Sequence, residues 1–138
     1  MNIEKYVLEE DVHVFYIQAD SFPDGALAAH QKLHTLIPYS DQRRYFGISN
    51  PDQTGTIIYR AAAEELMPNE AEKLRLETFV LKKGNYTRTL IKNYQKDISE
   101  IGKAFGTLLS DPDIDPLGAC VEWYVNNTDV QCMVRLIK

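Results

Sequence analysis

The elements that the sequence predicts follow one order in both halves of the chain, and this repetition constrains the fold most. In the first half, an alternating apolar strand at 12–17 precedes a helix. The helix begins near Ser21, a good N-cap, and ends near Ile37. Strands at 43–49 and 56–62 follow it, joined by a turn-rich segment.

The second half has the same order. After a connector at 67–72, strands at 74–81 and 86–91 precede a helix at 94–109, and a hairpin over 118–136 follows. The two helices share one apolar spacing, formed by Ala26, Ala29, Leu33, Leu36 and Ile37 in the first and by Ile98, Ile101, Phe105, Leu108 and Leu109 in the second.

Each half therefore contains the order strand, helix, strand, strand, and in the second half one further strand, at 74–81, precedes it. Units of this kind form antiparallel sheets with the helices on one side, so we predict an α+β fold. We expect a single domain, with repeat one at about 1–66 and repeat two at about 73–138.

Composition excludes several classes of protein. A chain of 138 residues with 44% hydrophobic and 25% charged residues fits one globular domain with a proper core. A net charge of −5 without a Lys/Arg cluster argues against direct binding of nucleic acid. No apolar run is long enough to span a membrane, and residues 1–5 lack the layout of a secretion signal, so we expect a cytoplasmic protein.

The C-terminal hairpin has two chemically different faces if its turn lies at Asn127-Thr128. One face is apolar and consists of Val121, Trp123, Val125, Val130, Cys132, Val134 and Leu136. The other mixes polar, aromatic and sulfur-containing groups: Cys120, Glu122, Tyr124, Gln131, Met133 and Arg135. We interpret this second face as the wall of a pocket. The two cysteines then point to opposite faces and are expected to be free thiols.

Glu122 is the main candidate on this face. A carboxylate among aromatic side chains is partly desolvated, so its pKa should rise unless a cation, such as a lipophilic ligand, is near. The alternative is a cross-strand ion pair with Arg135. Met133, placed opposite Glu122 by this register, is either an adaptable pocket wall or simple packing. Trp123, on the apolar face, is expected in the core.

Tyrosines supply the other candidates for a ligand site. Tyr124 shares the face of Glu122, and the strand tyrosines are weaker candidates: Tyr16, Tyr45, Tyr59 and Tyr86.

Metal binding and catalysis have little support. His30 and His34 are one helical turn apart, but Gln31 stands where the zincin pattern needs glutamate, and no third ligand is evident, so we expect both to flank the apolar stripe. Nucleophile-elbow and phosphate-loop motifs are absent. We predict no metal, no cofactor and no assigned catalytic residue.

Three motifs together resemble the GyrI-like (gyrase-inhibitor-like) small-molecule-binding domain, which is also the effector-binding domain of bacterial multidrug-responsive transcription activators. They are Lys82-Lys83-Gly84-Asn85-Tyr86, the Glu-x-Tyr within Gly118 to Tyr124, and Tyr45-Phe46-Gly47-Ile48. The resemblance implies two pseudo-symmetric SH2-like halves around a central cleft that binds bulky apolar, often cationic, compounds. It also implies that Glu122 faces the cleft.

The resemblance leaves three functions open. Because the chain begins at the ligand-binding half, we expect a stand-alone module that senses or sequesters amphipathic or cationic small molecules. A branch of the family hydrolyses cyclopropane-bearing compounds, for which Glu122 would be the general base and Tyr124 a positioning group. Gyrase-inhibiting members suggest a protein partner instead. The oligomeric state stays open.

Overall fold

The computed structural model describes Met1–Lys138 and confirms the α+β class. Its elements are β1 (Glu4–Leu8), β2 (Val12–Gln18), α1 (Ala26–Leu36), β3 (Tyr45–Pro51), β4 (Ile57–Glu64), α2 (Glu70–Leu74), β5 (Glu77–Leu81), β6 (Gly84–Ile91), the 3₁₀ helix η1 (Tyr94–Lys96), α3 (Ser99–Leu108), β7 (Cys120–Trp123) and β8 (Val130–Arg135). No helix is long and apolar enough to cross a membrane.

All eight strands form one antiparallel sheet in the order β1-β6-β8-β7-β3-β4-β2-β5. The order is symmetric, because β1 of the first half pairs with β6 of the second and β5 of the second half pairs with β2 of the first. The halves also join at the centre, where β3 pairs with β7. The repeat is therefore strand, strand, helix, strand, strand. The sequence pattern missed β1, a charged edge strand, and the short α2, which overlaps the expected connector at 67–72 and extends beyond it.

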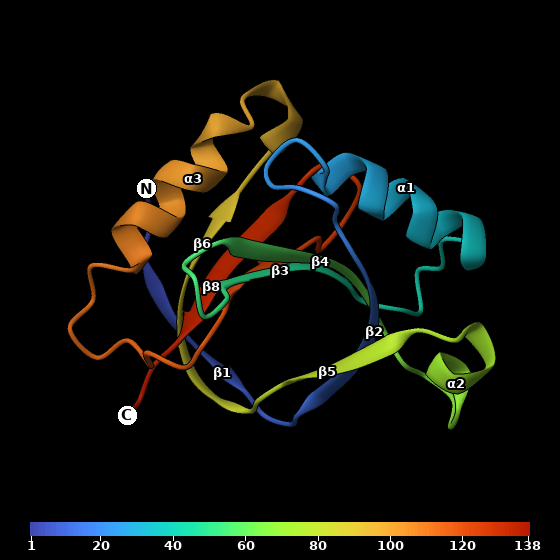
Figure 1. The fold of residues 1–138 in the computed structure, drawn as a ribbon. Coiled ribbons are helices and arrows are strands. Elements are labelled where there is room, and N and C mark those ends of the chain that lie inside the picture. Colours follow the sequence, from blue (N-terminus) through green and yellow to red (C-terminus); the bar gives the residue numbers. More distant parts are fainter.

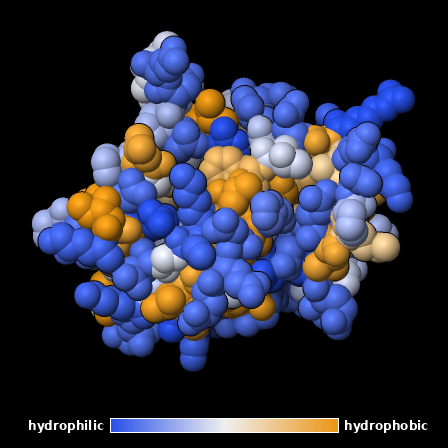
Figure 2. All heavy atoms as spheres, turned by 90° about the horizontal axis from the view of Figure 1, so that it is seen from below, coloured by the Kyte–Doolittle hydropathy of each residue, from blue (hydrophilic) through white to orange (hydrophobic).

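The sheet curls into a partial barrel, with α1 and α3 on its outer side (Figure 1). Its inner side holds a packed apolar cluster, here called the inner core: Leu8, Val12, Val14, Phe46, Ile48, Ala62, Leu81, Tyr86, Val121 and Met133. Seen from below, the hydrophobic residues at the surface form small groups among hydrophilic ones (Figure 2).

The helices each bury one side on the outer surface of the sheet. Ala29 and Leu33 of α1 pack over β2 and β4, and Phe105 and Leu108 of α3 pack over β6 and β8. The predicted stripes were too long at their ends, because Leu36, Ile98 and Leu109 are 41%, 65% and 49% exposed. The helices diverge from one another above the centre of the sheet (Figure 1).

The predicted register of the C-terminal hairpin is wrong by one residue. Glu122 lies opposite Cys132, and Met133 lies opposite Val121. The turn is held by Asn126, whose side-chain oxygen accepts hydrogen bonds from the backbone of residues 128 and 129. A shift of one residue moves every side chain of β8 to the other face.

The shift places both cysteines on the outer face, contrary to the prediction, since Cys132 pairs with Glu122 and Cys120 pairs with Val134. Both are free thiols. Burial raises the pKa of Cys120 to about 11 and that of Cys132 to about 12, so both stay protonated. Trp123 packs against the inner core, as expected.

Candidate functional site

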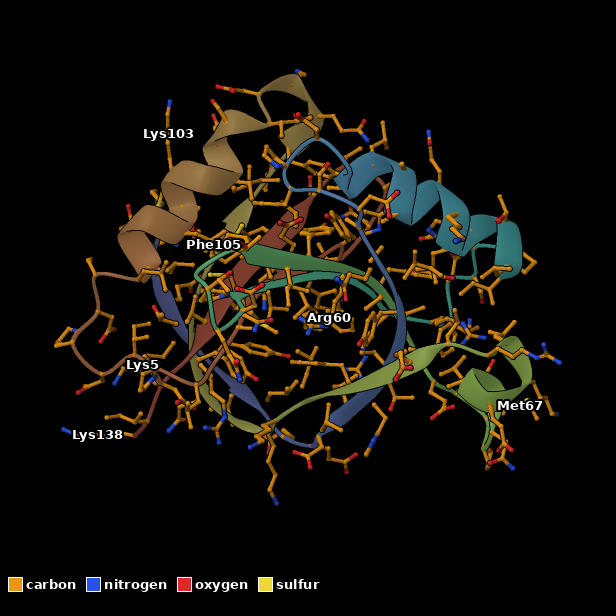
Figure 3. The ribbon with its side chains drawn as sticks, viewed as in Figure 1. Lys5, Arg60, Met67, Lys103, Phe105 and Lys138 are labelled. Atoms are coloured by element: carbon orange, nitrogen blue, oxygen red, sulfur yellow. The ribbon has the colours of Figure 1, made fainter.

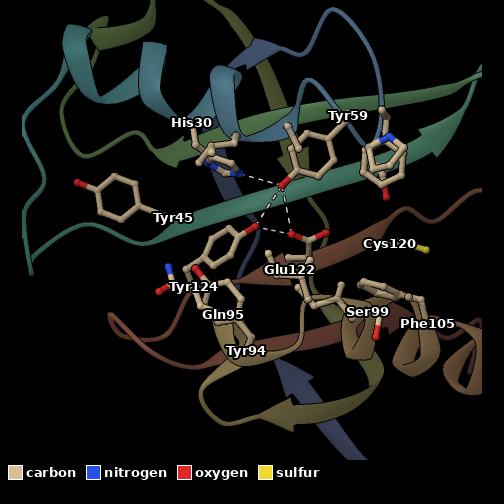
Figure 4. A pocket seen from close by; sticks show the side chains of 18 of the residues that line it. His30, Tyr45, Tyr59, Tyr94, Gln95, Ser99, Phe105, Cys120, Glu122 and Tyr124 are labelled. Carbon is tan, nitrogen blue, oxygen red and sulfur yellow. Dashed lines mark hydrogen bonds between the residues drawn. The ribbon is translucent and has the colours of Figure 1, made fainter.

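A cavity of about 800 Å³ opens between α1 and α3 over the central strands β3, β4 and β7. We call it the outer cavity. Among its 23 lining residues, 13 are hydrophobic. Aromatic and imidazole rings make up much of the wall: Phe22, His30, His34, Tyr39, Tyr45, Tyr59, Tyr94, Phe105 and Tyr124. Several of these rings surround a single carboxyl group (Figure 4).

That carboxyl group belongs to Glu122, which lies on the floor of the outer cavity in β7 and is only 7% exposed. It forms no ion pair. The predicted alternative, a pair with Arg135, is wrong, because Arg135 bonds to Asp115 at 3.1 Å from the opposite face of the hairpin. Glu122 is therefore a buried acid without a cationic partner.

Two tyrosine hydroxyls donate hydrogen bonds to Glu122. Tyr59 of β4 donates to Oε1 at 3.2 Å, and Tyr124, just beyond β7, donates to the same oxygen. The two hydroxyls also lie 3.1 Å apart, and His30 Nε2 of α1 lies 2.8 Å from the Tyr59 hydroxyl. These four side chains form one hydrogen-bonded network on the cavity floor (Figure 4).

Burial dominates the electrostatics of this network. It raises the pKa of Glu122, against the opposing effect of the two tyrosine hydrogen bonds. It also raises the pKa of Tyr59 and of Tyr124, with the charge of Glu122 adding to the shift, so both hydroxyls stay protonated donors. Burial, with a smaller effect of His34, lowers the pKa of His30 to about 4. The imidazole of His30 is therefore neutral near neutral pH.

Gly47 makes the close approach of these groups possible. It pairs with Glu122 across β3 and β7. A Cβ atom at this position would lie 2.1 Å from the Tyr59 hydroxyl and 2.9 Å from Glu122 Oε1. Any larger residue would therefore push Tyr59 off the floor of the cavity. The close approach of Tyr59 and Glu122 therefore explains why the Tyr45-Phe46-Gly47-Ile48 motif has a glycine at its third position.

The structure brings four of the seven predicted site residues to the outer cavity: Glu122, Tyr124, Tyr45 and Tyr59. Tyr16, Tyr86 and Met133 do not line it, because strand alternation turns them to the inner side. Met133 is fully buried there, Tyr86 donates a hydrogen bond to the Lys82 carbonyl at 2.6 Å, and the Tyr16 ring lies under the Arg60 guanidinium.

Sequence reasoning missed the helical wall of the site. His30 lies one residue after buried Ala29 and one turn after Ala26, positions that turn it toward the sheet. Phe22 stacks on Tyr59, with the ring centroids 5.2 Å apart, and Tyr94 lies against Tyr124 at 5.7 Å. No pattern in the sequence marks Phe22 or Tyr94. Both precede the α-helices, which begin at Ala26 and Ser99 and not near Ser21 and Tyr94 as predicted.

No group of three or more His, Cys, Asp or Glu side chains is arranged to hold a metal ion. The site therefore offers aromatic surface, one buried carboxyl group and hydroxyl donors. This set suits the binding of an apolar molecule with a positive charge, or proton transfer to a bound substrate.

No family model matches the sequence, and no curated protein matches it. Several solved structures share the fold. An integron cassette protein of Vibrio cholerae has a TM-score of 0.75 at 10% identity, over 99% of this chain and 96% of its own. SAV2435, solved bound to tetraphenylphosphonium, has a TM-score of 0.67 at 12% identity, over 99% and 94%. A hydrolase from Listeria innocua has a TM-score of 0.54 at 7% identity, over 98% and 91%. At these identities the likeness shows the fold alone.

Proposed function

We propose that the protein is a binding module for lipophilic small molecules, above all cations, and that it senses or sequesters them in the outer cavity. The observation that carries the proposal is Glu122, a buried carboxyl group without an ion pair on the floor of an open aromatic cavity. A bound cation would supply the missing positive charge in a site shielded from water.

The walls of the cavity suit such a ligand. Aromatic faces attract a cation by roughly 0.5–2 kcal/mol each. Tyr45, Tyr59 and Tyr124 supply such faces, and the exposed side chains of Phe22 and Ile98 also line the cavity. The volume of about 800 Å³ fits one drug-sized molecule. A net charge of −5 also favours the approach of cations.

The bound compound in SAV2435 supports the same chemistry, because tetraphenylphosphonium is a bulky cation without polar groups. It also provides the probe. Calorimetric titration of this chain with tetraphenylphosphonium should give one saturable site, and neutral triphenylphosphine oxide should bind more weakly. Absence of saturable binding by either compound, with the protein folded, would contradict the proposal.

A second candidate function is hydrolysis of a reactive, cyclopropane-bearing compound. It is favoured by the raised pKa of Glu122 beside two protonated tyrosine hydroxyls, since perturbed acids gather at catalytic sites. Glu122 would act as general base and Tyr124 would position the substrate. The Listeria protein described as a hydrolase shares the fold.

Mass spectrometry separates the two functions. Incubation with a panel of electrophilic cyclopropane compounds should leave them intact if the site only binds. Multiple turnovers that vanish in Glu122→Gln would assign the protein to the hydrolases. A protein-interaction role would be favoured by a collapsed cleft, whereas the outer cavity is open.

A further inference from the structure

The two oxygens of the Glu122 carboxyl group have different surroundings. Both tyrosine hydrogen bonds end on Oε1, and Oε2 accepts none (Figure 4). Only Arg43 Nε and Arg60 Nε are fully buried side-chain atoms without a hydrogen-bond partner, so the unpartnered Oε2 is not fully buried. It therefore keeps access to the outer cavity, although the residue as a whole is more than nine-tenths buried.

No side chain of the cavity wall donates a hydrogen bond to this oxygen. No Lys or Arg lines the outer cavity. His30 lies against the Tyr59 hydroxyl instead, and Cys120, the neighbour of Glu122 on the same face, carries a protonated thiol, which is a weak donor. An ionised Oε2 would be left as an acceptor with two lone pairs and no hydrogen-bond partner. A ligand that brings its own N–H would satisfy it.

We propose that the outer cavity selects organic ammonium ions that retain an N–H, that is, protonated secondary or tertiary amines with bulky apolar groups. The N–H donates to Glu122 Oε2 while the apolar groups occupy the aromatic wall. This inference rests on the proposed function and narrows its ligand class. Permanently charged phosphonium and quaternary ammonium ions gain the electrostatic attraction but not the hydrogen bond.

The expected preference for ammonium ions over quaternary ions depends on the strength of the hydrogen bond from the N–H group to Oε2. A hydrogen bond with an ionised partner is worth more than a neutral one, and in a site shielded from water it amounts to roughly a tenfold gain in affinity or more. Both kinds of cation lose hydration on entry, and the ammonium regains a partner. The quaternary ion leaves Oε2 unpaired.

The test compares three tricyclic compounds by calorimetry at pH 7: imipramine, a protonated tertiary amine; its N-methyl quaternary derivative; and neutral iminodibenzyl. Imipramine should bind about tenfold more tightly than the quaternary derivative. Glu122→Gln should reduce this ratio to near one. Glu100→Gln, which removes an equal charge from α3 outside the cavity, should leave the ratio unchanged.

The outcomes separate the two claims. Equal or tighter binding of the quaternary derivative, with both cations ahead of iminodibenzyl, would overturn the amine preference and leave the proposed function standing. A preference that survives in Glu122→Gln would also overturn it. Binding of none of the three compounds would contradict the proposed function itself. The decisive ratio is measured on the unaltered protein, so it does not depend on whether a variant folds.

Discussion

The two faces of the central strands β3, β4 and β7 differ in almost every physical respect. On the inner face, Phe46, Ile48 and Val121 are at most 1% exposed and pack into a continuous apolar core. On the outer face, the neighbouring positions carry Gly47 and Glu122, above which a cavity opens. One residue along the strand separates the two environments.

The two faces of the sheet therefore differ in their effect on stability. Burial of apolar surface on the inner side stabilises the fold, whereas the outer side carries a buried acid that costs stability. On the outer face, α1 packs over β2 and β4 and α3 packs over β6 and β8, and Phe105 lies between α3 and the sheet (Figure 3). The outer cavity lies between the two helices, over the central strands β3, β4 and β7.

The largest expected effect comes from the inner face. Phe46→Ala should lower the free energy of unfolding by about 3–5 kcal/mol, because it removes a fully buried ring from close packing. Urea unfolding followed by circular dichroism measures this. A loss below about 1 kcal/mol would show that the inner side is not the main source of stability.

Gly47→Ala tests the outer face separately from the inner face, because the added methyl group would lie on the outer face alone. The new methyl group would displace the Tyr59 hydroxyl and disturb the Glu122 network, at a cost in stability of about 1–3 kcal/mol. Binding of tetraphenylphosphonium should weaken as well. Gly106→Ala in α3 is the matched control, since a Cβ atom there meets nothing within 4 Å and the residue does not line the outer cavity. Equal effects of the two substitutions would argue against a tightly built floor.

Glu122→Gln should increase stability at high pH. The pKa of Glu122 is raised in the folded protein, so the stabilisation that goes with its protonated form is lost as pH rises through that value. Glutamine has no charge to bury, so the variant should be more stable than the unaltered protein at pH 8.5 and about equally stable at pH 4.5. Thermal unfolding at both pH values tests this; a pH-independent difference would contradict it.

Cation affinity should also depend on pH. Only ionised Glu122 attracts a cation, so tetraphenylphosphonium should bind more tightly as pH rises from 5.5 to 8, by less than tenfold per pH unit. His30 does not contribute in this range, since its pKa is lowered to about 4. Triphenylphosphine oxide should show no such dependence, and a parallel change for both compounds would point to a conformational cause.

The sequence predicted the fold class, both main helices and the position of Glu122 in the wall of a pocket, because these follow from apolar periodicity and from a single acid in an aromatic strand. The sequence-based predictions failed where contacts between different elements determine the structure. The hairpin turn could not be placed to within one residue, and that residue determined whether Met133 or Cys132 faces Glu122. Nor could it show that His30 reaches Tyr59, since the partners lie on different elements.

The selectivity of Glu122→Gln tests the central claim most directly. Calorimetric titration of both proteins with tetraphenylphosphonium and triphenylphosphine oxide compares a cation with a neutral compound of similar shape. We predict that the variant loses roughly 1–3 kcal/mol of binding free energy for the cation and nearly none for the oxide. Equal losses for both compounds would show that Glu122 shapes the cavity and does not select charge.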